Sequence, residues 1–159
     1  LSLHEHLRTV FARGISMDSS REYNINGDFS KPKPVDIKIQ WREANRTALI
    51  EIKFIGTVKK EADGEIYSLS DPRANKGLTQ LKEYHDAVSV DAPTTIIKSY
   101  LVVIDGRRNN LNSKKVTINT DDGLYFKNVD IIIEENNKFH ERILGFEKPI
   151  RMFAEPICT

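Results

Sequence analysis

The clearest hydrophobic pattern in the sequence lies between residues 35 and 55. Apolar and polar residues alternate along VDIKIQW (35–41) and again along ALIEIKFI (48–55), which is typical of half-buried β-strands. The polar residues between the two runs predict a hairpin with a four-residue loop, residues 43–46. In this register one face of the hairpin collects the apolar residues of both strands: Val35, Ile37, Ile39, Trp41, Ala48, Ile50, Ile52 and Phe54.

Two further segments have helical spacing. Near the N-terminus, an apolar stripe that Gly14 can end predicts a first helix: Leu3, Leu7, Val10 and Phe11. Ser70, Asp71 and Pro72 form a helix start, and the segment after them predicts a second helix with an apolar face: Leu78, Leu81, His85 and Val88. Gly77 lies inside this helix, where it costs about 1 kcal/mol relative to alanine.

The remaining segments predict strands and loops. REYNIN (21–26) predicts a short strand, and residues 57–70 a polar loop. The apolar run 99–105 predicts a central strand covered on both sides, joined to the hairpin by a right-handed crossover through the second helix. Further strands are expected at 116–119 and 127–133. This order predicts an α/β fold with a mixed central sheet flanked by helices.

Composition narrows the class of protein but not its function. With 159 residues, 30% charged and 39% hydrophobic, the chain suits one globular domain, residues 1–159. The net charge of +1 does not identify a partner. A single cysteine, Cys158, and no apolar run of the roughly 20 residues that a membrane span needs favour a cytoplasmic protein without membrane contact. The start at Leu1, without an initiator methionine, suggests a domain excised from a larger protein with further domains.

The polar face of the hairpin carries the candidate chemistry. The predicted register places Asp36 opposite Lys53 and Lys38 opposite Glu51, so Asp36, Glu51 and Lys53 form one cluster. A solvated face with cross-strand ion pairs is the alternative interpretation. Two features oppose this alternative. Leu49 and Ile55 share the face, which indicates that it is partly covered, and a buried carboxylate without a metal or full pairing is energetically costly.

The order of these residues resembles the PD-(D/E)XK nuclease superfamily. The matching pieces are PVD (34–36), EIK (51–53) and QLKEY (80–84), with Val35 separating the proline from the aspartate. The resemblance implies a restriction-endonuclease-like αβββαβ core over residues 3–105, with a C-terminal extension over 106–159. It also implies Mg²⁺-dependent hydrolysis of phosphodiester bonds, with Mn²⁺ as a substitute, and DNA as a more favoured substrate than RNA.

The resemblance also implies roles for single residues. The catalytic set would be Asp36, Glu51, Lys53 and Gln80. The two carboxylates and the main-chain carbonyl of Ile52 would hold the metal, because Mg²⁺ prefers oxygen ligands. Lys76 and Tyr84 would contact the nucleic acid, and Glu5 is a candidate further carboxylate. Independently of the resemblance, the basic loop with Arg107 and Arg108 is a candidate contact for a nucleic-acid backbone, although such a loop is usually only solvated.

Two questions stay open from the sequence. A nuclease-like fold can also serve as a catalytically inactive nucleic-acid-binding or assembly module, with the same charged residues acting as surface ion pairs. A homodimer is neither required nor excluded. A restriction, repair or antiviral-defence protein would be a fitting parent for either function.

Overall fold

The structure is a computed structural model that describes residues 17–24, 34–59, 65–111 and 117–158. Its strands are β1 (Met17–Asn24), β2 (Pro34–Trp41), β3 (Arg46–Lys59), β4 (Ile66–Leu69), β5 (Ile96–Gly106) and β6 (Ile150–Phe153). The helices are α2 (Asp71–Asp91) and α3 (Thr120–Leu124), with two short 3-10 helices, η1 (Glu135–Asn137) and η2 (Phe139–Glu141). The predicted first helix around residues 3–11, with the candidate Glu5, lies outside the described residues.

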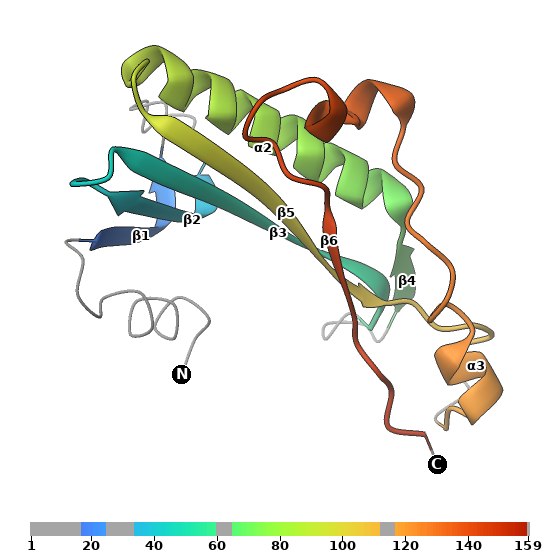
Figure 1. The fold of residues 1–159 in the computed structure, drawn as a ribbon. Coiled ribbons are helices and arrows are strands. Elements are labelled where there is room, and N and C mark those ends of the chain that lie inside the picture. Colours follow the sequence, from blue (N-terminus) through green and yellow to red (C-terminus); the bar gives the residue numbers. More distant parts are fainter. Residues whose placement is uncertain (1–16, 25–33, 60–64, 112–116, 159) are drawn as a thin grey trace.

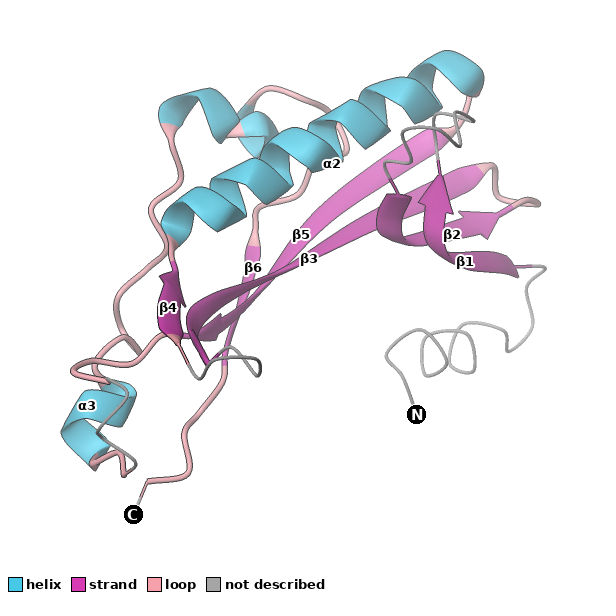
Figure 2. Cartoon of the chain, turned by 180° about the vertical axis from the view of Figure 1, so that it is seen from behind, coloured by secondary structure: helices cyan, strands magenta, loops and turns pink. Residues whose placement is uncertain are grey.

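The strands form one mixed sheet, which confirms the expected α/β class. The order is β1-β2-β3-β5-β6, and β4 pairs with the C-terminal end of β3. β3 and β5 are parallel, and the connection between them passes through α2, which lies across one face of both strands (Figure 1). Seen from behind, β4 lies beside the first turn of α2, and β1 and β2 lie at the other end of the sheet (Figure 2). In the described part of the chain, no helix has both the length and the hydrophobicity of a membrane span.

Helix α2 begins and packs as the sequence predicts. Ser70 is the N-cap residue, and Pro72 lies in the first turn, where its missing N–H removes no helical hydrogen bond. The predicted apolar face is buried against β3 and β5: Leu78, Leu81, His85 and Val88. Leu78, Leu81 and Val88 join Leu49, Ile55, Leu101 and Val103 from the sheet in the main hydrophobic core.

The hairpin between β2 and β3 has a loop of the predicted length, but the register is shifted by two residues. Trp41 pairs with Arg46, and Lys38 lies opposite Leu49 instead of Glu51. The loop is therefore 42–45 and ends at Asn45, which adopts a left-handed φ of 47°. Asparagine tolerates this conformation better than arginine, which would occupy the last position of the predicted loop. A shift by two keeps each side chain on its face, so the division into two faces is largely preserved.

Two residues depart from the predicted apolar face. Six of the eight apolar residues lie together on the face away from α2: Ile37, Ile39, Trp41, Ala48, Ile50 and Ile52. Val35, in contrast, packs into the core under α2. Phe54 belongs to neither core cluster, and its ring instead lies against Gly106. The ladder between β2 and β3 ends at Ile37, so pairing with β3 no longer fixes the direction of Val35, which pairs with Tyr23 of β1.

Apart from α2, the segments after residue 56 differ more from the predicted structure. β5 is fully buried on one face only, because buried residues alternate with exposed or half-buried ones along it. The expected loop 57–70 contains the end of β3 and all of β4. The described residues of the expected strands 116–119 and 127–133 do not form strands. Ile131 and Ile133 instead pack irregularly against the core.

A buried histidine joins α2 to β5 and leads to a prediction about pH. His85 Nδ1 lies 2.9 Å from Ser99 Oγ, and burial lowers the pKa of His85 below its ordinary value of 6.5, although Asp86 opposes this shift. The unfolded chain therefore takes up this proton at a higher pH than the folded chain. We expect the free energy of unfolding to fall below pH 6.5, by at most about 1.4 kcal/mol per pH unit. Urea unfolding of the parent and His85→Gln between pH 7.5 and 5 tests this, and equal slopes in the two proteins would contradict it.

Candidate active site

The middle of β3 carries an acid and a base on the sheet face that α2 covers. Glu51 and Lys53 are two residues apart and share this face with the core residues Leu49 and Ile55. Lys53 Nζ donates a hydrogen bond to Glu51 Oε1 over 2.5 Å, and the Glu51 side chain is only 3% exposed. A fully solvated face of ion pairs is therefore wrong for Glu51.

Asp36 approaches this pair from β2. Beyond the last ladder pair, Ile37 with Ile50, the N–H of Ile52 donates to Asp36 Oδ2 over 2.7 Å. Because Ile52 directly follows Glu51, this bond holds the Asp36 carboxylate near Glu51. The structure thus brings Asp36, Glu51 and Lys53 together, although the predicted cross-strand pairs that led to this cluster are shifted.

Burial and charge both oppose ionisation of Glu51. Burial raises the pKa of its carboxyl group, and the charge of Asp36 raises it further. The hydrogen bond from Lys53 lowers it but does not cancel the rise. Glu51 Oε2 is buried and has no hydrogen-bond partner within the described residues. A buried polar oxygen without a partner is unfavourable, so this oxygen favours a proton or a cation beside it.

Helix α2 brings two more predicted site residues to this face. Tyr84 is 3% exposed, and burial raises its pKa to about 12, with smaller contributions from the charges of Glu51 and Asp36. The phenol therefore stays protonated at neutral pH and lies within electrostatic range of both carboxyl groups. Gln80, one turn earlier on the same side of the helix, is half-buried, and Lys76 is exposed.

Gly77 is a site residue whose role the sequence pattern did not indicate. A Cβ atom at this position would lie 2.7 Å from Lys53 Cγ, closer than Cβ atoms approach their neighbours. The only sequence signal was the unfavourable glycine itself, inside a helix and three residues before Gln80.

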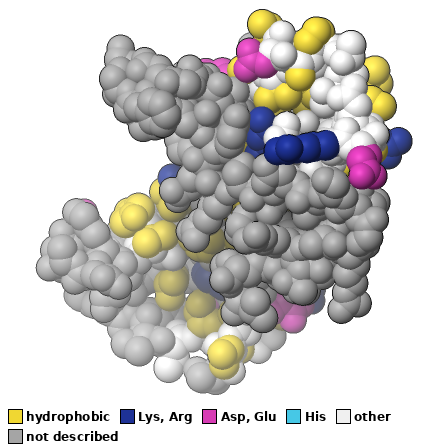
Figure 3. Space-filling view, turned by 90° about the vertical axis from the view of Figure 1, so that its left-hand side faces the viewer, with side chains coloured by type: hydrophobic (Ala, Val, Ile, Leu, Met, Phe, Trp, Pro, Cys, Tyr) yellow, Lys and Arg dark blue, Asp and Glu magenta, His cyan; other side chains and the backbone are white. Residues whose placement is uncertain are grey.

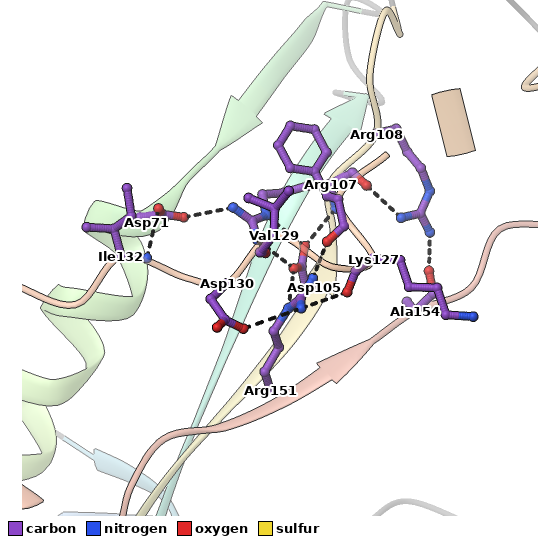
Figure 4. A network of polar contacts seen from close by, with 11 residues as sticks. Asp71, Asp105, Arg107, Arg108, Lys127, Val129, Asp130, Ile132, Arg151 and Ala154 are labelled. Carbon is purple, nitrogen blue, oxygen red and sulfur yellow. Dashed lines mark hydrogen bonds and ion pairs between the residues drawn. The ribbon is translucent and has the colours of Figure 1, made fainter. Parts of the chain in front are cut away.

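Arg107 and Arg108, the other predicted nucleic-acid contacts, bind groups of the chain itself. The Arg107 guanidinium donates to Asp105 and Asp71, and its side chain is 11% exposed (Figure 4). Arg108 donates to the main-chain carbonyl groups of Arg107 and Ala154. Both side chains line a pocket of about 490 Å³ at the first turn of α2, and none of the residues lining this pocket belongs to the Asp36, Glu51 and Lys53 cluster.

Neither the charge on the face seen in Figure 3 nor the metal-ligand side chains of the described residues give a second candidate site. Basic, acidic and hydrophobic side chains are interspersed among the described residues on the side of the molecule seen in Figure 3. Across residues 17–24, 34–59, 65–111 and 117–158, no group of three or more His, Cys, Asp and Glu side chains has the arrangement of a metal site. Any metal at the cluster would therefore depend on two carboxylates together with main-chain oxygen atoms or water.

The chain was also compared with known proteins. Neither the protein-family models, nor the curated proteins, nor the solved structures contain a significant match to it.

Proposed function

We propose that the chain is a Mg²⁺-dependent nuclease domain that hydrolyses phosphodiester bonds of DNA, as its resemblance to PD-(D/E)XK nucleases implies. The observation that carries the proposal is the buried Glu51 carboxyl group, which has Asp36 beside it, Lys53 on one oxygen and, among the described residues, no partner on the other. Such a group is costly in a purely structural role. It is useful where a cation is to be bound.

The donor set fits a hard divalent cation. Mg²⁺ prefers oxygen ligands and keeps several waters, so the Asp36 and Glu51 carboxylates and the carbonyl oxygen of Ile52 would suffice to hold it. A cation there would also offset the repulsion between the two carboxylates, which adds to the effect of burial in raising the pKa of Glu51. When bound, the ion would stabilise charge on the attacked phosphate and lower the pKa of a coordinated water. Mn²⁺ has similar ligand preferences and would substitute.

The remaining residues would bind and orient the reacting groups. The Lys53 ammonium group has three donors and uses one on Glu51 Oε1, which leaves others for the attacking water or a phosphate oxygen. Gln80 and Tyr84 would orient the nucleophile or the DNA backbone, and the exposed Lys76 would contact a phosphate. We leave Arg107 and Arg108 out of the proposed interface, because intramolecular hydrogen bonds hold both guanidinium groups.

One observation favours a second candidate, an inactive nuclease-like module that binds nucleic acid or assembles with other domains. The ion pair between Lys53 and Glu51 already neutralises one carboxylate without a metal. In such a module the cluster would have only a structural role, and nucleic acid would be bound without being cut.

Degradation of plasmid DNA with and without EDTA tests the proposed function. We expect cleavage in Mg²⁺ or Mn²⁺ that EDTA abolishes, because the reaction depends on the cation. Binding of DNA without cleavage in either metal would contradict the nuclease proposal and support the inactive module.

Metal binding gives a separate prediction. Isothermal titration with Mn²⁺ is expected to detect a site that Asp36→Asn removes, because a neutral amide lacks the charge that attracts the cation. Asp86→Asn is the matched control: its carboxylate is exposed and pairs with Lys82 on the surface of α2. A site that survives Asp36→Asn unchanged would rule out the assigned ligand.

A further inference from the structure

We propose that Gly77 is a positioning residue, whose missing side chain lets helix α2 hold the stem of Lys53 so that the amine stays on Glu51. The effect of Gly77 on catalysis rests on the proposed nuclease function. The packing of Gly77 against Lys53 does not, since it concerns only how α2 packs on β3.

The contact between α2 and Lys53 is too close for any side chain at position 77. A Cβ atom there would lie 2.7 Å from Lys53 Cγ and 3.1 Å from Lys53 Cε. Two carbons of one stem, on either side of Cδ, therefore lie against the Gly77 backbone. The Lys53 side chain therefore lies along the surface of α2 at Gly77 over more than one carbon.

Leu101 also prevents α2 from moving to make room for a side chain at position 77. The same Cβ atom would lie 2.9 Å from Leu101 Cδ1, and Leu101 is fully buried in the core between α2 and β5. Because buried side chains are closely packed, Leu101 cannot move aside without disturbing its neighbours. A side chain at position 77 would therefore be accommodated mainly by displacing Lys53, which is 15% exposed.

Confinement of the stem matters because lysine is long and flexible. A free lysine side chain samples many rotamers, and holding its amine at one point has an entropic cost. Packing against Gly77 restricts the stem, and the hydrogen bond to Glu51 Oε1 restricts the amine. A catalytic group must be held near its reacting atom, and a misplacement of about 1 Å can lower a rate by about 100-fold.

The first experiment measures the position of the amine directly. Acetylation of single lysines under limiting reagent, followed by peptide mass spectrometry, compares the parent with Gly77→Ala. We expect Lys53 to react faster in Gly77→Ala because its stem is displaced toward solvent, while exposed Lys82 reacts equally in both proteins and serves as the internal reference. An unchanged acetylation rate of Lys53 would overturn the inference.

A double-mutant comparison keeps the inference testable if Gly77→Ala folds poorly. Alanine normally favours a helix interior over glycine, so a lower urea midpoint for Gly77→Ala would itself indicate a steric conflict. The loss should be smaller when Gly77→Ala is made in Lys53→Ala, because the stem is no longer there. An equal loss in both backgrounds would assign the conflict to Leu101 alone and overturn the role in holding Lys53.

Cleavage kinetics test whether the packing of Gly77 against Lys53 matters for catalysis. If Gly77 positions Lys53, Gly77→Ala should lower kcat by about 100-fold with little change in KM, because the proposed DNA contacts other than Lys53 are retained. Val90→Ala, at an 80% exposed position near the end of α2, is the control for a substitution in this helix. If the parent protein cleaves no DNA, the proposed function is wrong. The acetylation and unfolding experiments still test whether Gly77 holds the Lys53 side chain.

Discussion

Replacement of Lys53 by alanine is expected to lower the rate of Mg²⁺-dependent DNA cleavage by at least about 100-fold, the usual size of the loss when a positioned proton-transfer or charge-stabilising group is removed. Its ammonium group lies 2.5 Å from Glu51 Oε1, in a site that α2 covers. Alanine retains neither the charge nor the donors. The measurement is the initial rate of plasmid cleavage at saturating Mg²⁺.

The controls for this prediction separate catalysis from folding. Lys82→Ala removes an exposed lysine of α2 that pairs with Asp86 and should cut DNA at the parent rate. Asp36→Ala should lose activity as Lys53→Ala does, and circular dichroism should show that both variants remain folded. If either Lys53→Ala or Asp36→Ala degrades DNA as fast as the parent, the site assignment is wrong.

The largest loss of stability is expected from Asp105→Asn, at about 3–5 kcal/mol, the typical cost of removing one partner from a buried ion pair. Asp105 is completely buried at the end of β5, and its two oxygens accept hydrogen bonds from Arg107 and from Arg151 of β6 (Figure 4). Arg107 also reaches Asp71 in the first turn of α2. Asparagine would leave two largely buried guanidinium groups without their shared carboxylate.

Urea unfolding at pH 7 measures this loss, and Asp130→Asn is the matched control. Asp130 also faces Arg151, at 3.9 Å, but it is fully exposed, so its replacement should change stability little. A free energy of unfolding for Asp105→Asn equal to that of the parent would show that the network does not hold β5, β6 and α2 together.

The same carboxylate predicts the direction of acid sensitivity. Burial opposes ionisation of Asp105, but the hydrogen bonds from Arg107 and Arg151 outweigh it and hold its pKa below the ordinary 3.8. The stabilisation from this group is therefore complete above pH 3.8 and is lost as the pH falls through the lower pKa of the folded state. Asp105→Asn should remove this part of the acid transition.

The hairpin shows how far a local pattern predicts structure. Alternation along residues 35–55 was enough to predict two paired strands and a four-residue loop, because a period of two is imposed by the strand itself. It did not decide between registers that differ by two residues, since both preserve the faces. The left-handed conformation of Asn45, which also bonds to the main chain of Thr94, distinguishes between them.

The second half of the chain was less predictable because its stability depends on contacts distant in sequence. The 127–133 segment is apolar enough for a strand, yet it runs irregularly along α2, and the Ile132 N–H donates to the Asp71 side chain. Asn75 on α2 accepts from Glu134 N in the same way. Side chains of the helix thus replace the partner strand that this backbone would otherwise need.

The candidate site, too, was determined partly by the local sequence pattern and partly by tertiary contacts. The sequence by itself determined the α/β class, the helix that begins after Ser70, and the presence of Asp36, Glu51 and Lys53 on neighbouring strands, because these follow from residue type and short-range periodicity. Only the tertiary structure decided that Glu51 is buried with one oxygen that has no partner in the described part of the chain, that Gly77 accommodates the Lys53 stem, and that Arg107 binds Asp105 and Asp71. The physical reason is that burial and hydrogen-bond partners depend on which distant segments pack together, and a periodic pattern does not specify that.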